Sequence, residues 1–291
     1  KPIDLSEMYN VRQTYGKKAW VFVMRQGHAQ FGEGGLAHDV INSARDFGLV
    51  PENVYTGLVG DAKKHNHAKM VADLEKILKG YAESKKLTPE WKSEVDKMLN
   101  ENLGSPVTEF TYEGKKYTPK SFLEMTKLNL DDYVTLSSYT HEPYYKTFLL
   151  DIPDNFSNGR FYNVPLDEFV QNIDNALDKG YTLALDADVS EDTFSGQNQM
   201  AVWPANAADK KAILTEIKPE LEVTAAFRQQ EFENFDTTDD HLMHIVGKVK
   251  DQKGNVYYKV KNSWGQSGPH AGFVYMSVPY LRLKSISVLV N

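Results

Sequence analysis

The spacing of the apolar residues changes along this chain. Up to about residue 180 they recur every three or four positions, as on one face of a helix. Six segments show this pattern: 3–20, 34–51, 67–84, 88–104, 117–128 and 165–180. β-Branched and aromatic runs of strand length follow at 181–189, 241–251, 255–264, 272–278 and 285–290. Helices followed by strands predict an α+β fold with two segregated halves.

Local signals mark the ends of several segments. Asp4 or Ser6 is a candidate N-cap for the first helix. The Thr-Pro pairs at 88–89 and 118–119 are typical of helix starts, because Thr caps a helix and Pro suits its first turn. Residues 253–255 predict a hairpin turn between two strands.

Composition is ordinary for a globular protein and excludes several kinds of site. The 291 residues carry 33 Lys and Arg against 40 Asp and Glu, and this net charge of −7 disfavours nucleic acid and an anionic membrane as partners. No apolar run approaches the length of a transmembrane helix. The absence of Cys excludes disulfides and thiolate metal sites. The chain opens with KPIDLSEMYN, without a Met or a signal peptide, and we expect that material upstream has been removed.

Two histidine clusters are weak candidates for a metal site. The HNH sequence at 65–67 is more simply the exposed start of a helix. The HLMH sequence at 241–244 lies in a strand-like run, where residues three apart point to opposite faces. One face therefore cannot present both His241 and His244, and we expect no metal and no other cofactor.

A pair of carboxylates suggests a different enzyme. Asp186 and Asp188 share one face of a predicted strand, with Cβ atoms about 7 Å apart from the two-residue repeat. Such a pair can serve as the acid and base of a glycosidase, so a hydrolase acting on glycans stays open. Carboxylates at a strand end are, however, more often solvated or hydrogen-bonded.

A third pattern joins a His, an Asn and a Trp. His241 opens one predicted strand, and Asn262 ends the next one after the hairpin turn. An Asn amide oxygen beside an imidazole fixes its tautomer and ring orientation. Trp264 can cover that hydrogen bond, and excluding water strengthens the contact. The order, the spacing and the NSWG tetrad together are far more specific than a lone His, Asn or Trp, each of which would belong to a core or a turn by default.

Four segments resemble the papain-like cysteine peptidases, in particular the branch of bleomycin hydrolase and bacterial aminopeptidase C. Residues 239–265 resemble the hairpin with the His and Asn, and 267–278 resemble the Gly-led strand after it. Residues 31–57 are similar to the glycine pair of the substrate cleft and its helix. Residues 181–190 resemble the strand before the barrel. The resemblance covers nearly the whole chain and is strongest in its last quarter.

The resemblance implies a catalytic role for three residues. His241 would be the general base and acid, Asn262 its orienting partner, and Trp264 a hydrophobic shield. The reaction would be acyl transfer, in which a thiolate paired with an imidazolium attacks a peptide carbonyl and water releases the acyl-enzyme.

The resemblance also implies how substrate is held. Gly34 and Gly35 would let the substrate backbone approach and pair with the protein main chain. Asp240 and Leu242 would flank His241 at the cleft.

By the same resemblance, the chain divides into three parts of a papain-like two-domain fold. Residues 1–61 would be the rest of a helical left domain with the cleft glycines, and 62–150 a helical insertion. Residues 151–291 would form an antiparallel, barrel-like right domain carrying the His and Asn.

Two features depart from the family pattern. The nucleophilic Cys belongs to a central helix that ends shortly before an L-S-E segment, and this chain begins at that segment. The branch also extends a C-terminal tail into the cleft to restrict cleavage to the substrate N-terminus, whereas this chain stops at SISVLVN. Aminopeptidase and endopeptidase specificity both stay open.

Two main interpretations follow. The first is an active cysteine peptidase, aminopeptidase-like, with the Cys on a missing segment or on a separate, cleaved N-terminal chain. The second is a Cys-less pseudo-peptidase that binds peptides or acts as a scaffold. Partners implied by the resemblance are peptide substrates and further copies in a homo-oligomer. The resemblance implies a cytoplasmic location, and an exported one stays open because the N-terminus is absent.

Overall fold

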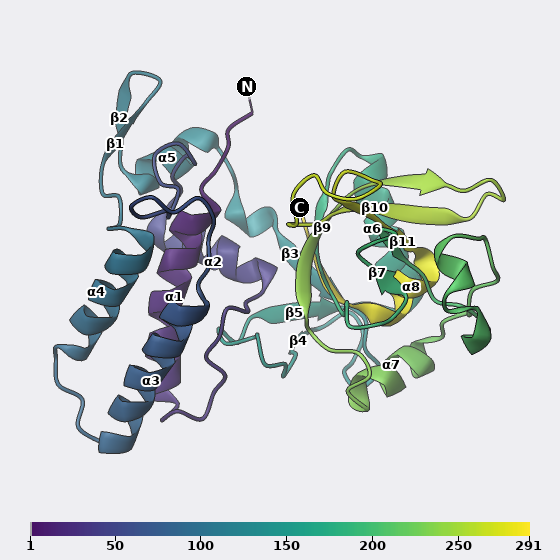
Figure 1. Cartoon of the computed structure of the whole chain (residues 1–291), viewed down its shortest axis with the longest axis horizontal. Coiled ribbons are helices and arrows are strands. Elements are labelled where there is room, and N and C mark those ends of the chain that lie inside the picture. The colour runs from purple at the N-terminus through teal and green to yellow at the C-terminus, as the bar shows by residue number, and fades with distance from the viewer. Residues whose placement is uncertain (1) are drawn as a thin grey trace. The chain divides into compact units, whose positions relative to one another are not determined.

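The computed structural model describes residues 2–291 as two compact units (Figure 1). The first unit holds the chain up to residue 131 together with 153–159, and the second holds 132–152 and 160–291. The described residues form eight α-helices and one large mixed sheet, which confirms the α+β class. None of these helices, in the part of the chain that the structure describes, is long and apolar enough to pass through a bilayer.

The first unit is built from five helices and a small hairpin. Its elements are α1 (Glu7–Met24), α2 (Ala37–Phe47), α3 (Ala68–Ser84), α4 (Trp91–Leu103), β1 (Phe110–Tyr112), β2 (Lys115–Tyr117) and α5 (Pro119–Thr126). α1 contacts α2, α3 and α4 and is the central helix of the unit. Leu74, Leu78 and Leu99 from α3 and α4 are fully buried in its core.

The helix starts follow most of the end signals in the sequence. Ser6 caps α1, since its hydroxyl oxygen accepts the N–H of Tyr9 at 3.0 Å. Thr118 caps α5 in the same way through the N–H of Ser121, which confirms the second Thr-Pro start. The first Thr-Pro start is wrong by two residues, because α4 begins at Trp91 with Glu90, not Thr88, at the N-cap position.

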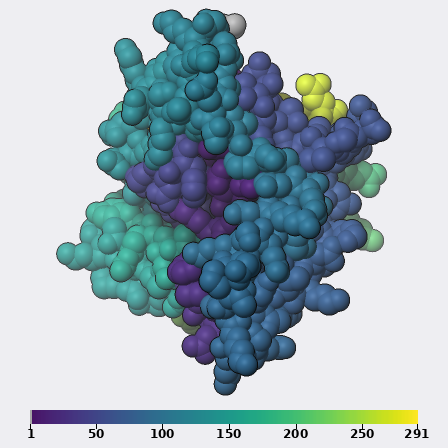
Figure 2. Space-filling view, turned by 90° about the vertical axis from the view of Figure 1, so that its left-hand side faces the viewer, coloured from purple at the N-terminus to yellow at the C-terminus, as the bar shows by residue number. Residues whose placement is uncertain are grey.

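A groove of about 910 Å³ crosses the surface of the first unit. Gly16 and Trp20 of α1, Trp91 of α4, Phe47 and Phe156 contribute to its lining. α1, purple in Figure 2, is visible at the bottom of a hollow on this side. Trp20 stacks on Trp91 with ring centroids 6.0 Å apart and is still 46% exposed. Part of the apolar surface of α1 is therefore open to solvent.

The second unit is a sheet of ten strands with three helices. Its strands are β3 (Val134–Ser137), β4 (Thr147–Leu149), β5 (Arg160–Asn163), β6 (Leu183–Ala187), β7 (Phe194–Ser195), β8 (Met200–Ala201), β9 (His241–Lys250), β10 (Val256–Lys261), β11 (Phe273–Ser277) and β12 (Ser285–Val290). Its helices are α6 (Leu166–Asp178), α7 (Ala225–Glu233) and α8 (Val278–Lys284). The strand order is β4-β5-β3-β12-β6-β9-β10-β11-β8-β7.

The sheet is mixed, not purely antiparallel as expected. β3 pairs with β5, and β8 with β11, in parallel, while the other neighbours are antiparallel. Both parallel pairs join strands that are far apart in the sequence, so no local hairpin sets their direction.

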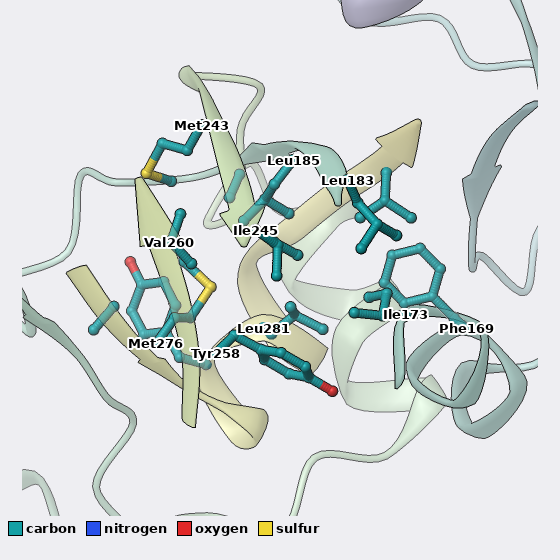
Figure 3. Packing of buried hydrophobic residues seen from close by; sticks show 14 of the residues in the cluster. Phe169, Ile173, Leu183, Leu185, Met243, Ile245, Tyr258, Val260, Met276 and Leu281 are labelled. Atoms are coloured by element: carbon teal, nitrogen blue, oxygen red, sulfur yellow. The ribbon is translucent and has the colours of Figure 1, made fainter. Parts of the chain in front are cut away.

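One core supports the central strands of this sheet. Figure 3 shows Phe169 and Ile173 of α6 packed toward Leu183, with Ile245 and Leu281 nearby. All five side chains are fully buried. This core holds β6, β9 and β10 together, and those strands carry the residues of the predicted site.

The two units divide the chain at positions different from those of the three predicted parts. Residues 1–61 and 62–131 contribute to one hydrophobic core and lie in one unit. Residues 132–150 join the second unit, because β3 pairs with the C-terminal strand β12.

Candidate active site

The hairpin of β9 and β10 brings together the His and Asn predicted from the sequence. His241 is the first residue of β9, and Asn262 directly follows β10. The strands are antiparallel, so the end of β10 lies beside the start of β9. Asp251 closes the turn at the other end by accepting backbone N–H groups from the residues after it.

The pairing of β9 with β10 contains one irregularity. Gly247 and Ile245 lie opposite consecutive residues of β10, so Val246 is an extra residue in β9. This is a β-bulge. Below it, His241 falls on the same face of β9 as Met243 and Ile245, both of which are buried.

The hydrogen bond between His241 and Asn262 has a defined polarity. His241 Nε2 lies 2.9 Å from Asn262 Oδ1, and the backbone N–H of Ser263 donates to the same oxygen at 2.7 Å. Only an oxygen can accept the Ser263 N–H, so the imidazole must donate from Nε2. This tautomer leaves His241 Nδ1 available to accept or return a proton.

Trp264 lies beside this pair. Its ring centroid is 5.8 Å from that of His241, with the planes inclined by 30°. The edge of Phe194 meets Trp264 from another direction, at 6.3 Å. Asn262 is only 4% exposed, whereas Trp264 is 50% exposed. The indole thus contacts the imidazole and Phe194 while half of its surface remains exposed to solvent.

The two residues expected to flank His241 are at the surface. Asp240 is exposed, and its carboxylate accepts the Thr238 hydroxyl at 2.6 Å. Leu242 is 37% exposed. Both therefore offer side-chain surface next to His241.

Gly34 and Gly35 lie in the first unit and have different surroundings. A Cβ on Gly34 would lie 1.9 Å from Asp154 Oδ2, so a carboxylate of the same unit occupies that space. A Cβ on Gly35 would meet only Asp39 Oδ2, at 3.7 Å. Gly34 is thus required by the packing of its own unit, and Gly35 is the more open of the two.

A buried lysine holds the main chain of this glycine segment. Lys18 of α1 is 4% exposed, and its ammonium donates to the carbonyl oxygen of Gly32 at 2.9 Å and to that of Gly34. Burial lowers the pKa of Lys18, while the neighbouring Asp154 and Asp39 raise it. Because Lys18 already bonds the Gly34 carbonyl, an incoming peptide would find Gly35 more accessible.

The carboxylates of the glycosidase alternative are buried. Asp188 is 1% exposed and accepts the Ser190 N–H and hydroxyl at 2.8 and 2.7 Å. Its Oδ2 lies 3.9 Å from Lys284 Nζ, and that fully buried ammonium also pairs with Glu191 and Glu231. Asp186 is 4% exposed. The surroundings of Asp188 are those of a structural ion pair.

The other histidines of the sequence clusters have separate partners. His244 Nε2 bonds the Thr182 hydroxyl at 2.7 Å, and burial lowers the pKa of His244. His67 Nδ1 lies 3.1 Å from the Tyr15 hydroxyl. His65 is exposed. His241 and His244 therefore contact different residues, as opposite strand faces require.

Sequence patterns gave no sign of several contacts around these residues. Lys18 and Asp154 reach the glycine segment from a helix and from a distant loop. Ser263, which settles the polarity of the Asn262 amide, belongs to the NSWG tetrad, but the tetrad does not predict that hydrogen bond. Contacts of this kind arise only in the folded chain and leave no local pattern in the sequence.

Comparison with known proteins agrees with this arrangement. A family model described as the Peptidase C1-like family matches residues 25–291. Aminopeptidase G of Lactobacillus delbrueckii subsp. lactis is 24% identical over 285 residues, covering 89% of this chain and 63% of the relative. The chain thus spans less than two thirds of the length of that relative.

A solved structure has the same fold. The crystal structure of PepW from Lactobacillus rhamnosis matches with a TM-score of 0.76 and 16% identity, over all of this chain and 73% of that one. The family model covers far more than half of the residues. The chain belongs to the Peptidase C1-like family.

Proposed function

We propose that this chain is the His- and Asn-bearing part of a papain-type cysteine peptidase with aminopeptidase-like activity. The thiol nucleophile would lie outside these 291 residues, which contain no Cys. The observation that carries the proposal is the His241–Asn262 hydrogen bond, with its donor on Nε2 and the Trp264 ring beside it. Family membership supports the same reaction class.

The chemistry would use His241 Nδ1 as the site of proton transfer. A Cys thiolate, having given its proton to Nδ1, attacks the peptide carbonyl carbon, and the C–N bond breaks as Nδ1 protonates the leaving amine. Water then attacks the thioester carbon and gives a proton to Nδ1, the C–S bond breaks, and the carboxylic acid leaves while the thiolate–imidazolium pair is restored. Asn262 keeps Nε2 protonated throughout, so the imidazole keeps its orientation.

Substrate would be a peptide bound along the glycine segment. Gly35 is the residue whose main chain we assign to substrate pairing, with Gly34 supporting it, and Asp240 and Leu242 would contact residues near the cleaved bond. The first unit would then correspond to the helical left domain of papain-like enzymes, and the second unit to the right domain. The Cys would lie on a helix that precedes α1 in the sequence.

A second candidate is a pseudo-peptidase that binds peptides without cleaving them. The lack of any Cys in the chain favours it. Intact-mass spectrometry after iodoacetamide treatment of the native protein separates the two candidates. A carbamidomethyl group on a longer parent chain or on a second polypeptide supports the peptidase. A single unmodified species at the mass of these 291 residues supports the pseudo-peptidase.

Substitution at the hydrogen-bonded pair tests the peptidase directly. In the native protein, His241→Ala should lower kcat/KM on an aminoacyl-coumarin amide by about 100- to 10,000-fold, the usual range for general acid–base catalysis. Asn262→Ala should cost less, because packing keeps part of the orientation. His244→Ala is the matched control and should behave as the parent. Parent-like activity of His241→Ala would refute the proposal.

A further inference from the structure

The loop that carries Trp264 is exposed and has few bonds of its own. Residues 263–271 are all exposed, between the buried Asn262 and Gly272. The Asn262 N–H donates to the Gly272 carbonyl at 3.2 Å and closes the base of the loop. Within the loop, the Gly272 N–H donates to the Ser267 carbonyl at 2.7 Å. These bonds alone do not tie the loop to the rest of the unit.

Gln199, in the turn between β7 and β8, supplies that connection. Its Nε2 donates to the Ser267 carbonyl at 2.7 Å, and its Oε1 accepts the N–H of His270. Gln199 is 3% exposed, so both ends of its amide are used in a buried setting where an unmade hydrogen bond would be costly. The backbone carbonyl of Gln199 also accepts the N–H of Tyr275 at 2.9 Å.

The backbone around Gln199 is arranged for this contact. Gln199 has a φ of +53°, a conformation that residues other than Gly rarely adopt. Gly268 faces it with a φ of +76°, and a Cβ there would lie 2.7 Å from Gln199 Cδ. A strained residue packed against an obligatory glycine indicates that the surrounding structure enforces this contact.

The same hairpin also touches the indole itself. A Cβ on Gly196 would lie 3.1 Å from the Trp264 ring, so the bare Gly196 backbone sits directly against it. Phe194 of β7 meets the ring edge-on. The hairpin from Phe194 to Ala201 therefore holds the Trp264 loop at three places: Gly196 and Phe194 against the indole, and the amide of Gln199 against the loop main chain.

We propose that Gln199 is a positioning residue that holds Trp264 over the His241–Asn262 pair. This inference rests on the proposed function for its effect on catalysis. Gln199 touches neither the reacting atoms nor His241; it acts through the loop. Loss of its amide should let the indole move away, admit water to the His241–Asn262 hydrogen bond and weaken the orientation of the imidazole.

The kinetic test compares two glutamines of the same turn. Gln199→Ala should lower kcat by about 10- to 100-fold, the effect expected when a reacting group is misplaced by about 1 Å, with KM changed by less than about twofold. Gln197→Ala is the matched control, because Gln197 is exposed in the same turn, and should match the parent. Gln199→Glu keeps the acceptor for the His270 N–H but cannot donate to the Ser267 carbonyl. Its kcat should therefore lie between those of Gln199→Ala and the parent.

A second readout needs no enzymatic activity. The chain contains four Trp residues, so 5-fluorotryptophan labelling gives four fluorine resonances, and Trp264→Phe identifies one of them. Gln199→Ala should shift or broaden the Trp264 resonance and leave the others in place, while Gln197→Ala should change none. If Gln199→Ala does not fold, Gln199→Asn, which is too short to reach both partners, replaces it.

The outcomes separate the two proposals. An unmoved Trp264 resonance in Gln199→Ala, or a kcat equal to that of Gln197→Ala in an active parent, overturns the positioning role alone. A parent without thiol-dependent activity refutes the proposed function, and the fluorine spectra then decide whether Gln199 holds Trp264.

Discussion

Replacing Gly34 by Ala should destabilise the first unit, whereas replacing Gly35 by Ala should not. The new Cβ at position 34 would lie 1.9 to 2.2 Å from the three carboxyl atoms of Asp154. The carboxylate would have to withdraw by more than about 1 Å, an overpacking that typically costs about 1–3 kcal/mol of unfolding free energy. Withdrawal would also strain its 3.1 Å hydrogen bond from Gln30.

Gly35 provides the control within the same segment. A Cβ there meets Asp39 at 3.7 Å, an ordinary contact, and neither glycine has a positive φ. Gly35→Ala should therefore be neutral or add about 0.4–1 kcal/mol by restricting the unfolded chain. The effect on substrate binding should be the reverse. If Gly35 pairs with substrate, Gly35→Ala raises KM, whereas Gly34→Ala acts mainly by lowering stability.

A double-mutant cycle in urea makes this quantitative. Tryptophan fluorescence would monitor unfolding in urea for the parent, Gly34→Ala, Asp154→Ala and the double variant, and each titration gives an unfolding free energy. Because Asp154→Ala removes the obstructing carboxylate, Gly34→Ala should cost little in that background. Equal costs of Gly34→Ala with and without Asp154 would refute the explanation.

Two further predictions concern buried charge. Burial lowers the pKa of His38 below 6.5, so the unfolded chain binds this proton more readily than the folded one; its stabilising contribution is complete above pH 6.5 and declines below it. His38→Gln should therefore make the unfolding free energy in urea fall less steeply as the pH drops below 6.5, and an unchanged slope would contradict this. Lys284→Met would leave the carboxylates of Asp188, Glu191 and Glu231 without their buried cation, at a cost of about 3–5 kcal/mol by calorimetry. Lys248→Met, which removes two partly exposed ion pairs, should cost less than about 1 kcal/mol, and similar losses for both lysines would be inconsistent with this argument.

Periodicity was enough to predict the long elements but not the short ones. The helices α2, α3 and α6 and the strands β6, β9, β10, β11 and β12 all lie within segments marked by apolar spacing, and α1 begins within its segment but continues to Met24, four residues beyond it. β7 and β8 have two residues each, too few to show alternation. They form because β8 pairs with β11, whose residues lie 75 positions further along the chain, and no local pattern predicts such a partner.

The site could be predicted where a hairpin relates its residues. His241 and Asn262 are 21 positions apart, and the turn between them is visible in the sequence, so their contact follows from antiparallel pairing. The reason for Gly34 could not be found in this way. Its neighbour Asp154 is 120 positions away, and only the folded chain shows that this carboxylate occupies the space of a side chain.

The extra residue Val246 in β9 restricts where relatives can gain or lose residues in the hairpin of β9 and β10. Residues added in the turn after Asp251 would leave every side chain between the bulge and His241 on its present face. Deleting Val246 would shift that segment by one position and reverse its faces, turning His241 away from Asn262 and bringing Leu242 inward. We therefore expect insertions and deletions among relatives to gather in the turn and to be absent between His241 and Gly247.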